Sequence, residues 1–497
     1  MDTFSLNPSV NAIYSSKTLN GLWSGSLTYL NRQRDEFEQT QNYGEYNYLA
    51  SWTPIDFLAF EVNGFLNYRN ANTSNFILSD FLTNSEDLVK TRSNRMSSTL
   101  DLTRGSWILA RGSASYSDTA SETPTFTTIN SNALDNDSLR LSGEVASGKR
   151  FNSIYFNLSG SFEKTERDSE SLEDFITRVG NAYSDINVYA NWAIRLSAKH
   201  EGNQISARNG GSGSIVREFN SYGIGLTYRA SELRYISLTL NKADSDDEEL
   251  DNDSFIGVDM AWALSARTNL SATYGKRFFG ESGSAKFSYN SKFLRASFAY
   301  TEDVTNTSRL LANQENLGVF VCPANAFSIA NCFQPSSLSY IPQAGEQFVQ
   351  LATQNIELQD NVILRKGANF QFGYDFSRVT VALSWLYSED NYLDFDRLRR
   401  TFSFGSKIAY QLGKDTSIGT SLNFANITER SDSKVFAGEG DNYNASVSLN
   451  RSLGKYLAVN LDFTFLKQEG DLTSGLSAFG NNFTDRRAGL SIIYTFE

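Results

Sequence analysis

The residues able to perform acid–base or nucleophilic chemistry are few in this chain. His200 is the single histidine among 497 residues and lies in an alternating segment that begins at Leu196. A hydrolase built on histidine needs a nucleophile motif or further histidines beside it, and no serine motif accompanies His200. We therefore expect a protein that is not an enzyme and carries no cofactor or metal, with His200 as a polar residue of a lumen or rim.

Two polar stretches have the composition of ligand-binding loops, but their residues are not placed as such loops require. Residues 244–253 hold a run of acidic side chains but lack the glycine and terminal bidentate glutamate of an EF-hand. We expect a solvated outer loop there, with weak Ca²⁺ bridging to lipopolysaccharide as the alternative. The glycine-rich piece 209–213 has neither the lysine nor the strand-to-helix context of a phosphate loop, so we interpret it as a flexible loop.

The two cysteines, Cys322 and Cys332, lie close together in one long polar segment. In an oxidising compartment we expect them to form a disulfide, which would close a small ring and stiffen the segment. Two free thiols are the alternative.

Composition narrows the class of protein. Aromatic residues make up 13% of the chain and prolines number 6, a mixture that favours strands. The mean hydropathy is −0.37, and no stretch approaches the roughly 18 consecutive apolar residues of a membrane helix. A helical membrane protein is therefore excluded, but a membrane barrel is not. The net charge of −12 argues against a nucleic-acid partner, which requires a basic face.

The end of the chain shows a pattern that other segments repeat. From residue 488 to 496 the side chains alternate, as in a strand that is apolar on one face. That face carries Ala488, Leu490, Ile492, Tyr494 and Phe496. Outer-membrane barrels commonly end on such a strand, which closes against the first one, although here Glu497 follows the last aromatic.

The connections between alternating segments fall into a short and a long class. Short turns, such as Gly413–Thr416, alternate with long polar segments at 70–92, 118–136, 166–182, 244–253, 306–360, 388–396, 430–441 and 469–483. Short periplasmic turns and long extracellular loops are typical of outer-membrane barrels. The sequence therefore predicts an all-β fold, a large transmembrane antiparallel up-and-down β-barrel of about 22–24 strands.

The number of strands has a consequence for how the barrel closes. Our count is about 23, whereas bacterial single-chain barrels use even numbers, and the first and last segments would run in the same direction. A strand before residue 3 is missing, or 3–16 lies outside the wall, or the count is wrong by one. We expect a single barrel domain over residues 1–497, from which a preceding strand and a signal peptide have been removed.

A central stretch resembles a known family. Residues 270–305 are similar to the uncharacterised outer-membrane barrels associated with the PEP-CTERM/exosortase system, in which a YGxRFFG segment precedes a hairpin that ends in YxED. The matching positions are Tyr274, Gly275, Arg277, Phe278, Phe279, Gly280, Tyr300, Glu302 and Asp303. The resemblance implies a barrel encoded beside exopolysaccharide-export genes, usually with one more strand at its start. It implies no catalytic residues.

The motif itself has simple physical interpretations. Gly275 and Gly280 can permit a tight turn or bulge. Arg277 can pair with a carboxylate in the lumen. Phe278 and Phe279 can anchor the chain in the interfacial aromatic belt, with a constriction of the channel as the alternative.

The function expected from these patterns is transport across the outer membrane. Unsatisfied polar groups are costly in lipid, so the polar face of each strand must enclose a wide wet lumen. We expect a gated conduit for exopolysaccharide, with 306–360 as the gate or plug and an ordinary surface loop as the alternative for that segment. The alternatives are a sheath around a periplasmic partner such as a multihaem cytochrome, or a diffusion porin or structural surface barrel. Expected partners are the lipid bilayer, lipopolysaccharide, a polysaccharide substrate and a periplasmic or outer-membrane export protein.

Overall fold

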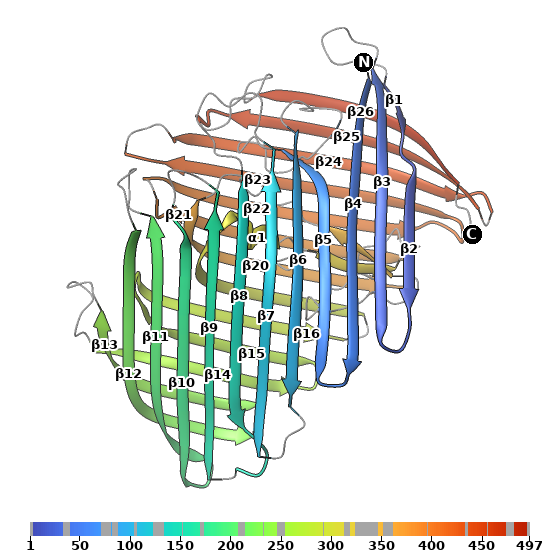
Figure 1. Cartoon of the computed structure of the whole chain (residues 1–497). Coiled ribbons are helices and arrows are strands. Elements are labelled where there is room, and N and C mark those ends of the chain that lie inside the picture. Colours follow the sequence, from blue (N-terminus) through green and yellow to red (C-terminus); the bar gives the residue numbers. More distant parts are fainter. Residues whose placement is uncertain are drawn as a thin grey trace.

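The computed structural model is almost entirely β-sheet (Figure 1). It describes residues 3–32, 40–70, 81, 88–103, 107–122, 134–151, 153–168, 173–206, 214–231, 233–245, 254–291, 293–312, 319–323, 346–350, 361–394, 396–432, 436–454, 456–473 and 482–494. Within this part of the chain, no helix is both long enough and apolar enough to cross a membrane.

The elements follow one another as long strands with one short helix. Their bounds are β1 (Thr3–Leu6), β2 (Ser9–Ser15), β3 (Leu19–Arg32), β4 (Thr40–Ile55), β5 (Leu58–Asn70), β6 (Leu88–Leu102), β7 (Ile108–Ser121), β8 (Asp135–Ser147), β9 (Ile154–Arg167), β10 (Phe175–Tyr189), β11 (Trp192–Ser206), β12 (Ser214–Ser231), β13 (Arg234–Ser245), β14 (Ser254–Ser265), β15 (Thr268–Arg277), β16 (Gly280–Asn290), β17 (Leu294–Asn306), α1 (Thr307–Ala312), β18 (Val319–Pro323), β19 (Glu346–Gln350), β20 (Val362–Phe376), β21 (Val379–Tyr392), β22 (Leu398–Gln411), β23 (Thr416–Arg430), β24 (Gly438–Ser452), β25 (Leu457–Gly470) and β26 (Phe483–Tyr494).

Each strand of the wall pairs antiparallel with its neighbour in sequence. β18 and β19 form a separate hairpin, and β17 pairs directly with β20 across it. β1 and β2 both pair with β3 and therefore occupy one position of the 24-stranded sheet. This up-and-down order confirms the predicted fold class. It also places residues 3–6 and 9–15 in the wall, so the alternative that 3–16 lies outside it is wrong.

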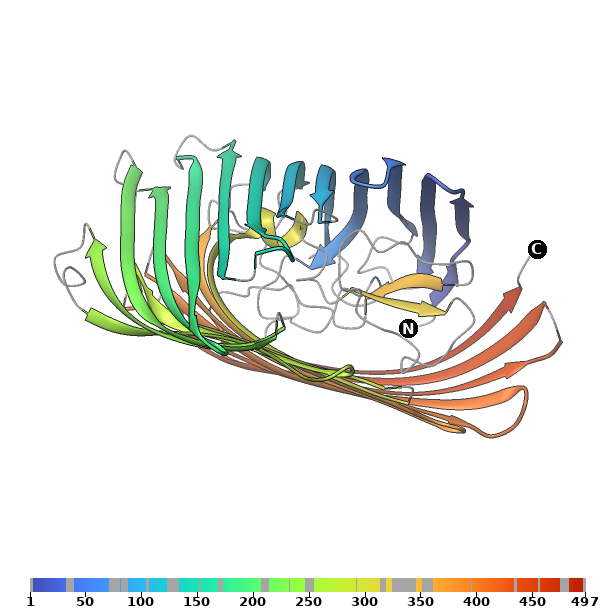
Figure 2. The same ribbon diagram turned by 90° about the horizontal axis from the view of Figure 1, so that it is seen from below.

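The two ends of the sheet run in the same direction. β2 and β26 both run toward the end of the barrel that carries the short turns. The wall has 23 positions, so the chain reverses direction 22 times between the first and the last, and an even number of reversals leaves the two strands parallel. Among the described residues β26 pairs with β25 only, and Phe496 of the predicted closing strand lies outside them. Figure 2 shows β2 and β26 at the two free edges of the curved sheet.

The wall is apolar outside and polar inside. Ile224, Leu238 and Leu490 point outward and leave 59%, 56% and 70% of their surface exposed. At the short-turn end aromatic pairs such as Trp192 and Tyr228 face outward with ring centroids 5.2 Å apart, which suits an interfacial belt. A soluble sheet would bury such a continuous face. The fold and this surface define an outer-membrane β-barrel.

The strands are longer than the sequence pattern indicated. β10 begins at Phe175, inside the predicted loop 166–182, and β21 continues to Tyr392, inside the predicted loop 388–396. A strand of 15 residues such as β10 spans about 50 Å, well beyond the ~30 Å of hydrocarbon. Above the apolar belt the outward face carries charged pairs, including Arg92 with Asp118 at 3.1 Å. Polar residues beyond the bilayer were therefore mistaken for loop.

The orientation of neighbouring side chains gives a direct test of this arrangement. On β24, Val447 faces outward and Ser448 faces the lumen. Val447→Arg is expected to destabilise the protein in lipid vesicles by about 2–4 kcal/mol, because lipid must then accommodate a charge. Ser448→Arg is expected to cost under ~1 kcal/mol, because its charge reaches water. Urea unfolding in vesicles measures both, and equal costs would contradict the assignment of faces.

Candidate functional site: the closed loop end of the lumen

The inner face of the wall is lined by small hydroxyl and amide side chains. Their hydroxyls bond across neighbouring strands, as in Ser113 with Ser142 and Ser421 with Ser446, both at 2.6 Å. Period-two alternation brings such residues to the concave side of every strand. The predicted polar lumen is therefore present over the described strands.

The long segment that follows β17 begins by turning into the lumen. α1 packs against the inner face of β6, β7 and β8, and Figure 2 shows both α1 and the β18–β19 hairpin between the two sides of the wall. The Asn306 side chain starts the helix by accepting a hydrogen bond from the Arg309 backbone N–H at 3.0 Å. Asn136 Nδ2 donates to Ser308 Oγ at 2.5 Å and ties the helix to β8.

A hydrophobic cluster joins opposite sides of the wall through this helix. Leu310 and Leu311 are 4% and 0% exposed. They pack with Phe65, Val89 and Leu134 from the side that contains β5, β6 and β8, and with Ile363 and Tyr392 from β20 and β21. Inward-facing apolar residues are unusual on a wet surface. Here they pack with α1 at the loop end of the lumen.

Arg309 fastens α1 to the wall. Its Nε lies 3.0 Å from Glu163 Oε1, and its Nη1 donates to Thr177 Oγ1 at 3.0 Å. The guanidinium lies 3.9 Å from the ring centroid of Phe175, a cation–π geometry. Burial lowers the pKa of Arg309 to about 10, so the group is still charged at neutral pH.

A second cluster lies at the loop end, beside the sharp bend of the sheet. It contains Phe175, Ile205, Phe219, Ala243, Phe278, Val304, Val362 and Leu364, with Phe255, Phe279 and Leu393 packed against it. Phe278 is 4% exposed, and the rings of Phe278 and Phe279 meet edge to face at 5.1 Å. The assignment of these two residues to the interfacial belt is therefore wrong. Both residues pack with side chains of the inner face instead, and a constriction of the channel stays a prediction.

Arg277 connects the two halves of the family motif. Its Nη2 lies 2.6 Å from Oε1 of Glu201, which is 0% exposed, and this confirms the predicted pairing with a lumen carboxylate. Its Nη1 donates to the Glu302 carbonyl oxygen at 2.8 Å, and its Nη2 lies 3.4 Å from Asp303 Oδ1. The Tyr300 hydroxyl in turn donates to the Glu302 carboxylate.

The glycines and the tyrosine of the motif have different roles. Gly280 has φ +108°, a conformation suited to glycine, and ends a two-residue turn between β15 and β16. This turn lies at the loop end, so the strict alternation of short and long connections is wrong at that place. Gly275 lies within β15 at ordinary φ, and Tyr274 faces outward with 45% exposure. The structure therefore brings Arg277, Phe278, Phe279 and the β17 residues together, without Tyr274.

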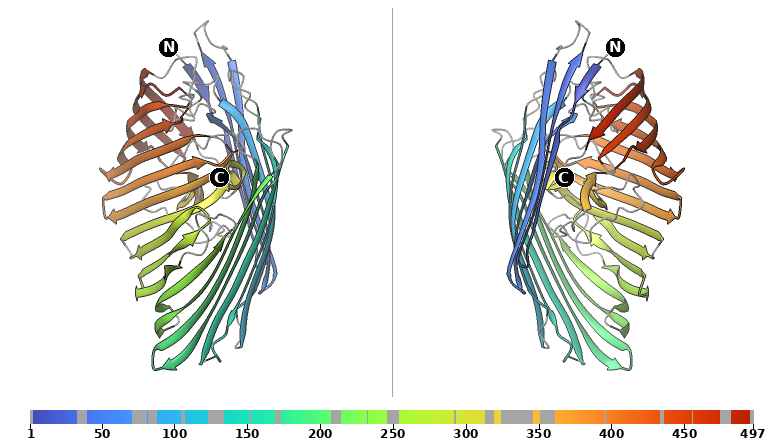
Figure 3. Two further views of the ribbon diagram at one scale, coloured as in Figure 1. Left: turned by 90° about the vertical axis from the view of Figure 1, so that its left-hand side faces the viewer. Right: turned by 90° about the vertical axis from the view of Figure 1, so that its right-hand side faces the viewer.

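A charged network at the bend was not predicted from the sequence. Asp185 on β10 accepts hydrogen bonds from Arg195 at 2.6 and 2.8 Å and from Arg229 at 2.5 Å. Arg195 also reaches Asp259 on β14 at 2.6 Å, which is possible only on the concave side of a tightly curved sheet. In Figure 3 the two sides of the wall join along these green strands and diverge toward the blue and red ends. A Cβ at Gly225 would lie 2.0 Å from the Leu238 carbonyl oxygen, so this glycine permits the close approach.

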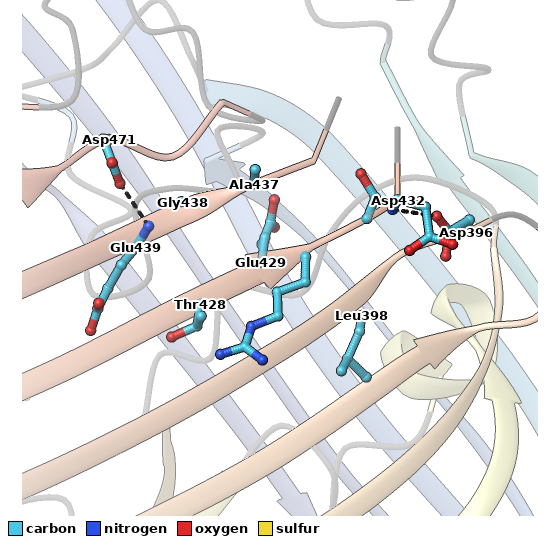
Figure 4. Close-up of a pocket in the computed structure, with 11 residues that line it drawn as sticks. Asp396, Leu398, Thr428, Glu429, Asp432, Ala437, Gly438, Glu439 and Asp471 are labelled. Carbon is cyan, nitrogen blue, oxygen red and sulfur yellow. Dashed lines mark hydrogen bonds between the residues drawn. The ribbon is translucent and has the colours of Figure 1, made fainter. Parts of the chain in front are cut away.

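A pocket of about 800 Å³ opens at the loop end between β22 and β25 (Figure 4). Its acidic side chains are engaged by the surrounding loops: Asp396 accepts from the Asp432 N–H at 2.6 Å, and Asp471 from the Glu439 N–H at 2.8 Å. Glu429 is buried and bound to Arg397 at 2.6 Å. These contacts brace the connections at this end of the barrel.

His200 lies on the outward face, where its Nδ1 is 2.7 Å from Asn220 Oδ1. Its predicted place in the lumen is therefore wrong, and a rim position above the apolar belt remains. Over the described residues, no group of His, Cys, Asp and Glu is arranged to hold a metal ion. The acidic stretch 246–253, the glycine-rich 209–213 and Cys332 lie outside the described residues, so the structure does not test the predicted disulfide with Cys322.

Comparison with known proteins gives fold-level likenesses. No family model and no curated protein matches the chain. The ferric enterobactin receptor mutant (R480A_Q482A) of Pseudomonas aeruginosa aligns with 97% of this chain and 81% of its own, at TM-score 0.44 and 10% identity. The FrpB iron transporter of Neisseria meningitidis (F3-3 variant) aligns with 99% of this chain and 80% of its own, at 0.42 and 11%. The siderophore receptor PirA of Acinetobacter baumannii aligns with 99% of this chain and 80% of its own, at TM-score 0.42 and 10% identity. With TM-scores below 0.5, these likenesses carry no argument about what this chain binds.

The Arg277–Glu201 pair makes a measurable contribution to stability. Arg277→Ala is expected to destabilise the barrel by about 3–5 kcal/mol, because a buried carboxylate loses its counter-ion. The double variant Glu201→Gln/Arg277→Gln is expected to recover part of this loss. Arg400→Ala, which breaks an exposed pair with Glu389 at 2.7 Å, is the control and is expected to cost under ~1 kcal/mol. A loss for Arg277→Ala no larger than that of the control would refute a buried pair.

Proposed function

We propose that the protein is a gated conduit that exports a large hydrophilic polymer, an exopolysaccharide, across the outer membrane. The observation that carries the proposal is the contrast between the two ends of the lumen. The wall is lined by hydroxyl and amide groups over most of its height, whereas α1 and two apolar clusters occupy the loop end. A permanent structural barrel would need no wet interior of this size.

The chemistry of the lining supports a polyhydroxylated cargo. Serine, threonine and asparagine offer many weak, interchangeable hydrogen-bond partners, and water can replace each of them at little cost. Most inward-facing ions at the loop end are engaged with each other, as in Arg365 with Asp390 at 2.6 Å. A hydrated polymer can therefore slide along this surface without being trapped at any one position.

The closure is built to be released. α1 has only six residues, and it is attached by a polar anchor, Arg309, and an apolar one, Leu310 with Leu311. A segment of this length has little stability of its own. Loss of either anchor therefore favours withdrawal of the segment from the lumen and an open channel.

A planar-bilayer recording tests the gate. The unaltered protein is expected to be nearly silent, and Arg309→Ala is expected to raise its conductance by about tenfold or more, since removing a buried charge-assisted anchor costs several kcal/mol and 1.4 kcal/mol already changes a population tenfold. Arg400→Ala, an exposed arginine outside the lumen, is the matched control and is expected to remain silent.

The outcome also separates the candidate functions. A large steady current through the unaltered protein would favour a diffusion porin and contradict the gate. Silence of both Arg309→Ala and the double variant Leu310→Ser/Leu311→Ser would mean that the barrel is filled by something other than α1. Co-purification of a haem protein would then favour a sheath around a partner.

Deletion of the gene tests the cargo. Surface polysaccharide is expected to disappear while polymer accumulates in the periplasm, and expression of the intact chain is expected to restore export. Unchanged surface polysaccharide in the deletion strain would reject the proposal.

A further inference from the structure

We infer that the inner wall formed by β16 to β24 is a binding track for an anionic polysaccharide, one that carries carboxylate groups along its length. The inference rests on the proposed conduit and adds the charge class of the polymer. It starts from Lys286 and Lys407, two lumen-facing ammonium groups that have no hydrogen bond or ion pair with the described residues.

The register of the strands aligns these cations with small residues. Lys407 on β22 pairs with Ala382, Ala382 with Gly373, and Gly373 with Arg295 on β17. Arg295 and Lys407 are thus three strands apart in one transverse row, about 14 Å at ~4.8 Å per strand. The residues between them, Gly373 and Ala382, have at most a methyl side chain, so the two strands between the cations add no bulky side chain to this row.

Neutral polar residues and a third cation adjoin this row. The next row toward the loop end consists of Ser288, Ser297, Gln371, Ser384, Gly405, Asn423 and Asn444. Lys286 lies in the row after that, paired with Ala299, and is exposed to the lumen. Across these three rows the described side chains of β16 to β24 include no carboxylate.

This composition differs from that of the rest of the lumen. On the opposite side of the wall Arg111 lies 3.5 Å from Asp101 and Arg140 lies 3.7 Å from Glu163, so basic groups have acidic neighbours. The protein as a whole carries a net charge of −12. Rows that carry lysines and no described carboxylate, inside an acidic protein, attract anions and repel cations, and low-dielectric walls strengthen the field.

The position of the track suits a polymer that enters from the short-turn end. Lys286 lies five residues before the turn that begins at Ser291, about 16 Å along the strand, and below the two apolar clusters. Lysines hold anions as mobile point charges. Hydroxyl and amide rows beside them can bond the sugar hydroxyls. Several weak contacts of this kind retain a chain and still let it move.

Binding to the purified full chain in detergent tests the track. The probes are fluorescent oligogalacturonate and dextran of equal length. Oligogalacturonate is expected to bind at least tenfold more tightly than dextran, and its affinity is expected to fall as salt is raised. Lys286→Gln/Lys407→Gln is expected to weaken oligogalacturonate binding by about fivefold to tenfold and to leave dextran unchanged, since each exposed charge pair contributes about twofold to fivefold.

The matched control is Lys164→Gln/Lys467→Gln, which removes two lysines from the outward face. It is expected to bind oligogalacturonate like the unaltered protein. Equal binding of both probes, or equal losses in the two double variants, would overturn the anionic track. Neither result depends on the conductance of Arg309→Ala. The bilayer recording therefore tests the conduit, and the binding assay separately tests the charge of its cargo.

Discussion

Hydrocarbon offers no partner for a backbone N–H or C=O group, and this constraint determines the architecture of the chain. Only a sheet that pairs each strand with the next can satisfy those groups within a bilayer. The pleat of each strand then fixes the alternation, because successive side chains point to opposite faces, one toward lipid and the other toward water. The 24-stranded sheet meets this requirement along its length. Its two edges, β2 and β26, run in the same direction.

A water-filled lumen would let solutes leak across the outer membrane unless part of it were closed. Apolar residues of the inner face form two clusters near the loop end, one with α1 and the other with the turn at Phe278. The ion pairs of Arg277 and Arg309 hold these two pieces against the wall. In the proposed conduit, these few side chains of the described residues would form the closure.

The sequence predicts the wall better than it predicts the closure. Period-two alternation identifies the strands and their outward faces, because lipid and water act on every residue of a strand. It misplaces the loop-side ends, since beyond the bilayer both faces of a strand such as β21 are polar at residues 388–391. The sequence predicts that Arg277 pairs with a lumen carboxylate. It does not indicate which one, because Glu201 lies 76 positions away along the chain. Contacts across the lumen, such as Leu311 with Phe65, depend on curvature that no local pattern encodes.

Cysteine labelling from the two sides of the membrane measures most directly whether the lumen is wet and closed only at its outer end. In a chain whose native cysteines are replaced by serine, Ser446→Cys faces the lumen and Val447→Cys faces lipid. A membrane-impermeant maleimide should modify Ser446→Cys rapidly when it is supplied from the periplasm and slowly when it is supplied to intact cells. Val447→Cys should remain unmodified in both. Rapid labelling of Ser446→Cys in intact cells, or equal labelling of the two positions, would contradict the account.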